Sequence, residues 1–282
     1  MKEIVIKSYG KVNLGLDVLY KREDGYHEIS TVMQQIDLSD TVTIRENEGD
    51  IVLESDCGGL PLDSTNLVYR AWRAIQDRTG IDKGVQIIIQ KNIPVSAGLA
   101  GGSSNAAAVL RGLNQLWDLD LKEEELKDIG RGIGADVPFC ISGGTALAEG
   151  IGDKLTPLKP FKDKELLLIN PGAKVSTAEI YSSLNPNDKK RVDIRKIVSS
   201  IEEDDIRGVA NNIENIMEDV VLKKVPIISH IKADMVKYGA LGTLMSGSGP
   251  TVFGLFDDKE KLEFSMKRLR SKYPTVLLAK TI

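Results

Sequence analysis

Apolar residues in the first half of the chain recur with the spacings of β-strands and of amphipathic helices. Alternating or short continuous apolar runs predict strands over residues 3–8, 11–19, 41–45, 51–54 and 85–90. A spacing of three to four residues predicts helices over 66–79, 103–117 and 123–131, the last with Asp120 and Glu123 as a capping box. Strands and helices are therefore mixed in this half.

In the second half, the pattern of apolar and polar residues changes after Pro157 and Pro160. Before these prolines, Gly143-Gly144 leads into a predicted strand over 145–149. After them the pattern predicts a buried strand over 166–169, mostly helices over 188–238, strands over 241–246 and 251–256, a helix over 258–272 and a strand over 275–280. A length of 282 residues favours about two domains, which we place at 1–157 and 158–282, with strands able to cross the boundary.

The composition is that of an ordinary globular protein, with 41% hydrophobic and 28% charged residues. A net charge of −4 argues against a nucleic-acid-binding surface. Two cysteines, far apart and accompanied by two histidines, support neither a disulfide framework nor a zinc site. No apolar run approaches the length of a membrane span, so we expect a cytoplasmic protein with no membrane partner.

The segment PVSAGLAGGSSNAAA, residues 94–108, predicts a phosphate-binding loop that runs into a helix. Gly98, Gly101 and Gly102 allow positive φ and close approach of backbone N–H groups to an anion. The helix N-terminus that follows also favours negative charge. The loop lacks the Gly-Lys-Ser/Thr ending of a Walker motif and the G-x-G-x-x-G spacing of a dinucleotide fold. The alternative is a tight strand-to-helix connection that binds nothing.

Two segments near the N-terminus place polar groups together. Strand alternation puts Lys11, Asn13, Gly15 and Asp17 on one face, where the lysine and asparagine could hold a phosphate and a hydroxyl; the alternative is a solvated polar face. Asp24-Gly25 is a turn signal, and the Tyr26 and His27 that follow it could stack on and hydrogen-bond a planar base. The alternative for this pair is a packed tyrosine and a surface histidine.

Two later segments have the composition of loops that take part in catalysis. In GADVPF, Asp136 could accept a proton from a substrate hydroxyl, and Pro138 biases Val137 towards an extended conformation outside a helix. The alternative is an aspartate that caps a helix or makes a turn. The small-residue segment 246–251, SGSGPT, could close over a phosphate or a substrate, or be a plain turn.

In this order, the segments together resemble the GHMP kinase superfamily of galactokinases and of homoserine, mevalonate and phosphomevalonate kinases. PVSAGLAGGSSNAAA resembles the central ATP loop of the superfamily, and MSGSGPTVF resembles its C-terminal motif. KVNLGLDVLYKREDGYHEI and GADVPFCISGGTALAEGIGDKL narrow the match to the ATP-dependent kinases of the non-mevalonate isoprenoid route, whose substrate is a cytidine diphosphate derivative. The resemblance runs from the first strand to about Pro250.

The resemblance implies a two-lobed α/β fold. Its N-terminal ATP-binding lobe would contain a left-handed β-α-β unit, an exception to the right-handed rule, and its C-terminal lobe an antiparallel sheet with helices. It also implies ATP as phosphoryl donor, Mg²⁺, a small-molecule substrate, and a monomer or weak homodimer. No acidic magnesium ligand can be assigned from the pattern; loop hydroxyls such as Ser104, phosphate oxygens and water could supply the coordination.

Site residues carry over from the resemblance position by position. Lys11 and Asp136 match the catalytic pair, with Asp136 as the proton acceptor and Lys11 as its electrostatic partner, and Asn13 matches a contact to the substrate. Tyr26 and His27 match residues that recognise the cytosine, Tyr181 matches an aromatic that stacks on the other face of that base, and Thr177 lies near the same pocket in this alignment. The contacts to ATP are Asn66 on the adenine side and the loop residues Pro94, Val95, Ser96, Ala97, Gly98, Leu99, Ala100, Gly101, Gly102, Ser103 and Ser104.

Ala97 and Ala100 depart from the family pattern, since relatives often carry glycine there. We expect both alanines to have negative φ. Two other functions stay open on the same fold. A mevalonate-type kinase would not require Tyr26, His27 and Tyr181. A non-catalytic sensor would not require Lys11 and Asp136.

Overall fold

The chain folds into two compact units, each made of several segments. The computed structural model describes residues 2–184 and 191–282. Unit 1 comprises Met1–Gly10, Leu38–Val95 and Ala100–Gly143, and unit 2 comprises Lys11–Asp37, Ser96–Leu99 and Gly144–Ile282. Strands β1 (Glu3–Lys21) and β2 (His27–Asn47) contribute residues to both units. The predicted division between residues 157 and 158 stays a prediction.

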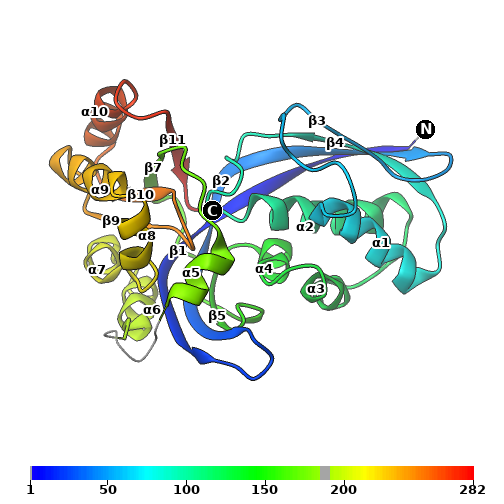
Figure 1. Ribbon diagram of the computed structural model, residues 1–282, viewed down its shortest axis with the longest axis horizontal. Helices are drawn as coiled ribbons and strands as arrows, with labels where there is room; N and C mark the ends of the chain where they lie inside the picture. Colours follow the sequence, from blue (N-terminus) through cyan, green and yellow to red (C-terminus); the bar gives the residue numbers. More distant parts are fainter. Residues whose placement is uncertain (1, 185–190) are drawn as a thin grey trace. The chain divides into compact units, whose positions relative to one another are not determined.

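Unit 1 is a sheet covered on one face by helices. Its strands follow the order β3 (Val52–Ser55), β4 (Gly84–Gln90), β2 and β1. Helices α1 (Leu67–Thr79), α2 (Gly101–Leu116), α3 (Glu123–Arg131) and α4 (Val137–Ser142) lie on one side of it (Figure 1). β3 and β4 are parallel neighbours with α1 between them in sequence, which is the expected β-α-β unit; its hand stays a prediction.

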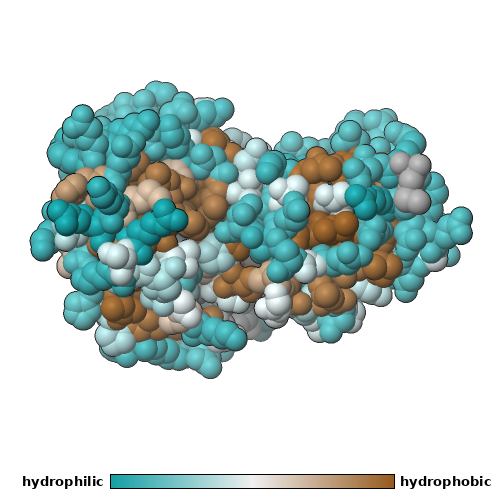
Figure 2. Space-filling model, turned by 90° about the horizontal axis from the view of Figure 1, so that it is seen from above, coloured by the Kyte–Doolittle hydropathy of each residue, from teal (hydrophilic) through white to brown (hydrophobic). Residues whose placement is uncertain are grey.

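The core of unit 1 forms where the apolar face of the sheet packs against the apolar faces of the helices. Val42 and Ile44 of β2 and Ile87 and Ile89 of β4 are buried together with the apolar stripe of α2. The alternate residues of these strands, such as Thr43, face away from the helices. Figure 2 views the molecule from above and shows hydrophilic residues mainly around the outer rim, with several apolar patches between them.

Unit 2 contains a four-stranded antiparallel sheet. Its strand order is β11 (Thr275–Lys280), β7 (Glu165–Asn170), β10 (Val252–Phe256) and β9 (Gly242–Met245). Every residue of β10 is buried, and α9 (Ile227–Lys237) and α10 (Lys259–Leu269) pack against the sheet. The antiparallel sheet with helices predicted for the C-terminal lobe is therefore present.

The remaining elements of unit 2 surround the ends of β1 and β2. β5 (Thr145–Gly150) pairs with β2 and with β6 (Lys154–Pro157), and β8 (Glu214–Asn215) pairs in parallel with β1. The helices are α5 (Thr177–Ser183), α6 (Ile194–Glu202), α7 (Ile206–Asn212) and α8 (Glu218–Lys224). The first three residues of the helical region predicted at 188–238 lie outside the described residues.

Three local predictions are wrong. β2 is a single strand of 21 residues, although only 41–45 was predicted, because the buried polar residues Thr31 and Gln34 interrupt its apolar alternation. Val137 starts a helix despite Pro138, since a proline in the first helical turn loses no helical hydrogen bond. Helix α3 is capped later than Asp120, with the N–H of Lys122 donating to Oε2 of Glu125 at 3.0 Å.

Candidate active site

In unit 1, the predicted phosphate loop ends at the N-terminus of α2. The N-cap is Ala100, whose side chain makes no capping hydrogen bond, so the first N–H groups of the helix have no side-chain acceptor. A Cβ placed on Gly134 would lie 3.8 Å from Oγ of Ser103. The first turn of α2 and the segment before Asp136 are therefore close neighbours, so the predicted anion site and the predicted proton acceptor lie near each other in unit 1.

The conformation of Ala100 differs from the negative φ that was expected for it. Its φ is +56°, in the left-handed region, whereas Ala97 has no positive φ. An L-residue in this region costs about 1–2 kcal/mol, so the surrounding contacts must hold Ala100 there. The amide of Ser104 donates to the carbonyl of Ala100 at 2.8 Å, which fixes the turn at the start of the helix.

A buried polar network that the sequence analysis missed supports α2 in unit 1. Lys91 forms an ion pair with Asp40, whose other oxygen accepts the N–H of Ile93 at 2.8 Å just before the loop. Nδ2 of Asn105 on α2 donates to Asp40 at 2.9 Å. Ser104 donates to the carbonyl of Tyr9 at 2.6 Å. The network joins both ends of the loop to the sheet, and only the burial of these polar side chains reveals it.

In unit 2, residues 96–99 of the loop pack on the segment that precedes β10. Oγ of Ser246 donates to the carbonyl of Gly98 at 2.9 Å and accepts the amide of Asn13 at 3.3 Å. Gly98 has a φ of +76°, and a Cβ there would lie 2.2 Å from the carbonyl oxygen of Ser246. The two small-residue loops predicted from the sequence are therefore neighbours, and Gly98 is required for their close approach.

The polar face of β1 is buried, which excludes the alternative of a solvated face. Lys11 and Asn13 are 5% and 1% exposed, and Nζ of Lys11 donates to Oδ1 of Asn13 at 2.7 Å. Nδ2 of Asn13 donates to Oγ1 of Thr31 at 2.8 Å. The carboxamide is thus fixed between the lysine and β2. Lys11 and Asp136 belong to different units, and their predicted pairing stays a prediction.

The aromatic residues of the predicted base site also meet in unit 2. The rings of His27 and Tyr181 stack with centroids 5.0 Å apart and planes inclined by 26°. Tyr26 is 61% exposed, so the alternative of a packed tyrosine is wrong. Burial and, to a smaller extent, the charge of Lys21 lower the pKa of His27 below its ordinary value, which favours a neutral imidazole. Thr177 lies about one helical turn before Tyr181 on α5.

Thr177 on α5 contacts the loop before β10, and Asn215 on β8 binds the same loop. The hydroxyls of Thr177 and Ser248 are 2.8 Å apart. Nδ2 of Asn215 donates to the carbonyls of Met245 and Gly247, both at 2.8 Å. Asn215 was not predicted from the sequence, where it reads as one polar residue in a helical region. Its burial and its two acceptors make it the support of this loop.

Two predicted residues lie at helix starts. Asp136 occupies the N-cap position of α4, but its side chain makes no capping hydrogen bond, so the capping alternative does not explain this carboxylate. Asn66 does cap α1: its Oδ1 accepts the amide of Val68 at 2.9 Å, and its Nδ2 donates to the carbonyl of Pro61 at 2.6 Å. A contact of Asn66 with adenine stays a prediction.

The described residues contain no group of three or more histidine, cysteine, aspartate or glutamate side chains that could hold a metal ion. Within the same part of the chain, none of the helices is both long enough and apolar enough to span a bilayer. Ser104 is 1% exposed, and its hydroxyl already donates to Tyr9 and accepts from Ser8 at 2.8 Å. A magnesium ion at the loop would therefore rely mainly on phosphate oxygens and water.

Comparison with known proteins identifies the family. The profile of the GHMP kinases N terminal domain matches residues 66–144, and that of the GHMP kinases C terminal matches residues 197–275. The chain is 50% identical over 279 residues to the 4-diphosphocytidyl-2-C-methyl-D-erythritol kinase of Clostridioides difficile (strain 630), covering 98% of this chain and 94% of the relative. The chain belongs to the GHMP kinases. Within them, it belongs to the 4-diphosphocytidyl-2-C-methyl-D-erythritol kinase family.

Two further relatives carry the same name, and a more distant structure shares the fold alone. The kinase of the same name from Clostridium botulinum strain Hall is 47% identical over 283 residues, covering 98% of this chain and 99% of the relative. A crystal structure of 4-(cytidine 5'-diphospho)-2C-methyl-D-erythritol kinase superposes with a TM-score of 0.84 at 31% identity, covering 99% of both chains. A homoserine kinase structure from Cytophaga hutchinsonii, at 20% identity and a TM-score of 0.80, shares the fold, covering 100% of this chain and 95% of that chain.

As a member of this family, the protein is a small-molecule kinase that uses ATP as its phosphoryl donor. The predicted superfamily, two-lobed α/β fold and kinase activity are confirmed. The individual roles of Lys11, Asp136 and the substrate contacts stay predictions.

Proposed function

We propose that this protein transfers the γ-phosphoryl group of ATP to the 2-hydroxyl of 4-diphosphocytidyl-2-C-methyl-D-erythritol, giving the 2-phosphate and ADP in the methylerythritol phosphate route to isoprenoids. The observation that carries the proposal is the identity of 50% along 98% of the chain with a kinase of that name. The proximity of His27 and Tyr181 supports it, because aromatic faces suit a planar cytosine; a base that binds between the two rings would have to separate them.

The phosphates of ATP would lie at the loop formed by residues 94–104. The uncapped amides at the start of α2 favour the triphosphate, and Gly98 allows a close approach of the backbone. Asn66 would contact the adenine side. Mg²⁺, bound mostly through phosphate oxygens and water, would reduce the negative charge that the attacking oxygen meets.

Asp136 would accept the proton of the substrate's 2-hydroxyl as the oxygen attacks the γ-phosphorus in line and ADP leaves. Lys11 would keep that carboxylate ionised, since a nearby opposite charge favours the charged form. Asn13, fixed by Lys11 and Thr31, would orient the substrate. Tyr26, His27 and Tyr181 would bind the cytosine, with Thr177 beside them. No covalent enzyme intermediate is needed.

The proposed substrate is a small, highly charged molecule. The reaction therefore needs neither nucleic acid nor a membrane, and we place it in the cytoplasm. A monomer or weak homodimer remains a prediction from the sequence.

The test measures ADP release from ATP with 4-diphosphocytidyl-2-C-methyl-D-erythritol as acceptor, beside mevalonate, homoserine and galactose. Turnover with the cytidine compound alone is the expected result. Asp136→Asn should keep ATP binding and lose a factor of about 100 or more in kcat, while Asp128→Asn, an exposed aspartate on α3, should leave kcat unchanged. Turnover with a different acceptor overturns the substrate, and normal kcat in Asp136→Asn overturns the role of that carboxylate.

A further inference from the structure

Asn215 and Glu218 have no role in the proposed reaction, yet both bind the chain where it enters the loop before β10. Nδ2 of Asn215 donates to the carbonyls of Met245 and Gly247, both at 2.8 Å. Oε2 of Glu218 accepts the amide of Met245 at 2.9 Å. Side chains therefore hold both backbone polar groups of Met245 and the carbonyl of Gly247.

The side chains of Asn215 and Glu218 are buried. The two residues are 5% and 9% exposed. Oδ1 of Asn215 also accepts the amide of Met217 at 3.0 Å, and Glu218 at the start of α8 forms an ion pair with Lys232 of α9. Burying an amide and a carboxylate costs free energy unless both are hydrogen-bonded. The remaining bonds of these groups go to the backbone of residues 245–247, so they fix its direction.

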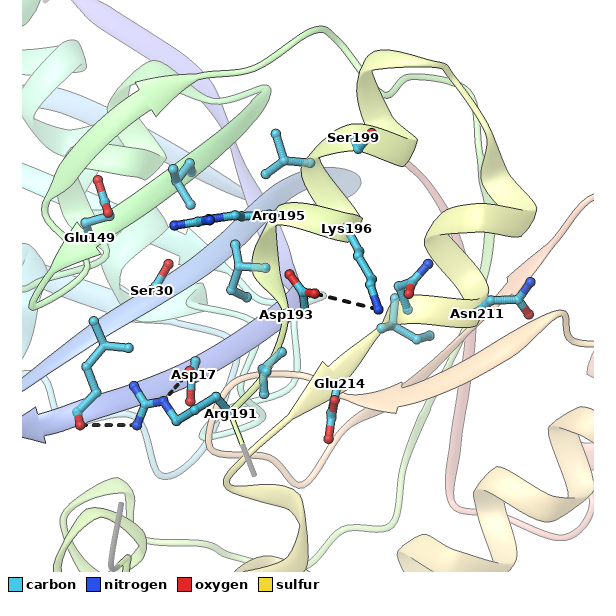
Figure 3. Close-up of a pocket in the computed structure, with 17 residues that line it drawn as sticks. Asp17, Ser30, Glu149, Arg191, Asp193, Arg195, Lys196, Ser199, Asn211 and Glu214 are labelled. Carbon is cyan, nitrogen blue, oxygen red and sulfur yellow. Dashed lines mark hydrogen bonds and ion pairs between the residues drawn. The ribbon is translucent and has the colours of Figure 1, made fainter. Parts of the chain in front are cut away.

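Strand alternation on β8 separates Asn215 from its neighbour Glu214. Figure 3 shows Glu214 among the residues that line a pocket of about 1020 Å³ in unit 2. Glu214 is exposed and, among the residues that the structure describes, forms no ion pair. A change at Glu214 is therefore a matched control for a change at Asn215.

The loop before β10 makes two hydrogen bonds to carbonyls of the predicted ATP loop. Oγ of Ser246 donates to the carbonyl of Gly98 at 2.9 Å. The amide of Thr251 donates to the carbonyl of Ala97 at 3.3 Å. The backbone of two consecutive residues of the ATP loop is therefore held from this one side.

These two hydrogen bonds set the direction of two amides. The peptides that join Ala97 to Gly98 and Gly98 to Leu99 are trans, and in a trans peptide the N–H points opposite to the C=O. The N–H groups of Gly98 and Leu99 therefore point away from the loop before β10. Within the described part of the chain, neither N–H donates a hydrogen bond to the protein. Both can donate to an anion.

We propose that Asn215 and Glu218 are positioning residues for ATP. By fixing the loop before β10, they keep the amides of Gly98 and Leu99 turned towards the phosphates. This role rests on the proposed function, which places the triphosphate at the ATP loop. Without the two side chains, the peptides of the ATP loop can rotate, and fixing them again on binding costs affinity.

Calorimetric titration with ATP and Mg²⁺, without an acceptor, measures the effect. We expect Asn215→Ala and Glu218→Ala each to raise Kd for ATP about tenfold. Glu218→Gln keeps an acceptor for the amide of Met245, so its Kd should stay within about twofold of the wild type. Glu214→Ala should match the wild type. The titration contains no acceptor, so its outcome does not depend on the identity of the substrate.

Leu262→Ala separates positioning from general stability. Leu262 lies on α10 and is 1% exposed, so the loss of its side chain should lower the melting temperature. Kd for ATP should stay unchanged in this variant. A loss of ATP affinity in Leu262→Ala as large as that in Asn215→Ala would assign the effect to destabilisation and overturn the positioning role.

Gly98→Ala distinguishes a failure of the proposed ATP site from a failure of the positioning role. An unchanged Kd for ATP in Gly98→Ala overturns the ATP site. A weakened affinity there, with unchanged affinity in Asn215→Ala and Glu218→Ala, overturns the positioning role alone. Where Asn215→Ala does not fold, Ser246→Ala tests the same step, because it removes the donor to Gly98 and leaves β8 and α8 intact. It should raise Kd for ATP at least about threefold, and an unchanged Kd overturns the positioning role.

Discussion

Gly98 gives the sharpest test of the contact between the two small-residue loops of unit 2. Replacing it with alanine places a Cβ 2.2 Å from the carbonyl oxygen of Ser246 and 3.1 Å from both N and O of Gly249. These are backbone atoms, so no side chain can rotate away to relieve the overlap. Either the loop before β10 or the ATP loop must move.

The expected cost has two parts. The φ of Gly98 is +76°, and a left-handed conformation costs an alanine about 1–2 kcal/mol. Overpacking against fixed atoms adds about 1–3 kcal/mol. Gly80→Ala is the matched control, because Gly80 has a φ of +72° and no atom within 4 Å of the added Cβ. The control therefore carries the first part alone.

Urea unfolding of both variants measures the difference. We expect Gly98→Ala to lose about 2–5 kcal/mol and Gly80→Ala about 1–2 kcal/mol of the free energy of unfolding. Gly98→Ala should also raise KM for ATP, which Gly80→Ala should not. Equal destabilisation of the two variants, within about 0.5 kcal/mol, would refute the close packing of Gly98 on Ser246.

Two further predictions concern buried charge and titration. Lys91→Met should lower the free energy of unfolding in urea by about 3–5 kcal/mol, because it leaves the carboxylate of Asp40 buried without a cation. Lys2→Met, at an exposed lysine, is the control. A loss no larger than that of the control would contradict the prediction. The pKa of His27 is lowered from 6.5, so its contribution to stability is present above pH 6.5 and is lost as the pH falls through the lower folded-state pKa. NMR titration, with the second histidine removed by His230→Gln, should give a midpoint below 6.5, and a midpoint above it would overturn the assignment.

The sequence predicted the segments that form the site better than the contacts that support it. Glycine spacing marked the predicted ATP loop and the loop before β10, which pack closely on each other, because a close approach of two backbones requires glycine. The turn predicted at Asp24-Gly25 is present between β1 and β2, although the strand that starts at His27 was not predicted. These signals are local, and each can be recognised within a few residues.

The missed features depend on residues that are distant in the chain. Thr31 and Gln34 lie inside β2, and their side chains are satisfied by Asn13 and Thr145, so the strand tolerates polar residues that its local pattern argues against. The left-handed φ of Ala100 likewise cannot be derived from an alanine in the sequence, since it is imposed by the packing around α2. Tertiary contacts decide both cases.

Buried polar side chains identify the residues that support the two small-residue loops. Burying a polar group costs free energy unless it is hydrogen-bonded, so each such group needs a compensating reason to persist. In unit 1, Asp40, Lys91 and Asn105 gather where the ATP loop begins and ends. In unit 2, Oγ of Ser246 accepts the backbone N–H of Asn13 and donates to the carbonyl of Gly98, and Nδ2 of Asn215 donates to the carbonyl of Gly247. Apolar residues could fill the same volume, but they could not fix backbone N–H and C=O groups in direction. The placement of these polar groups is therefore best explained by the need to hold the loops in one conformation.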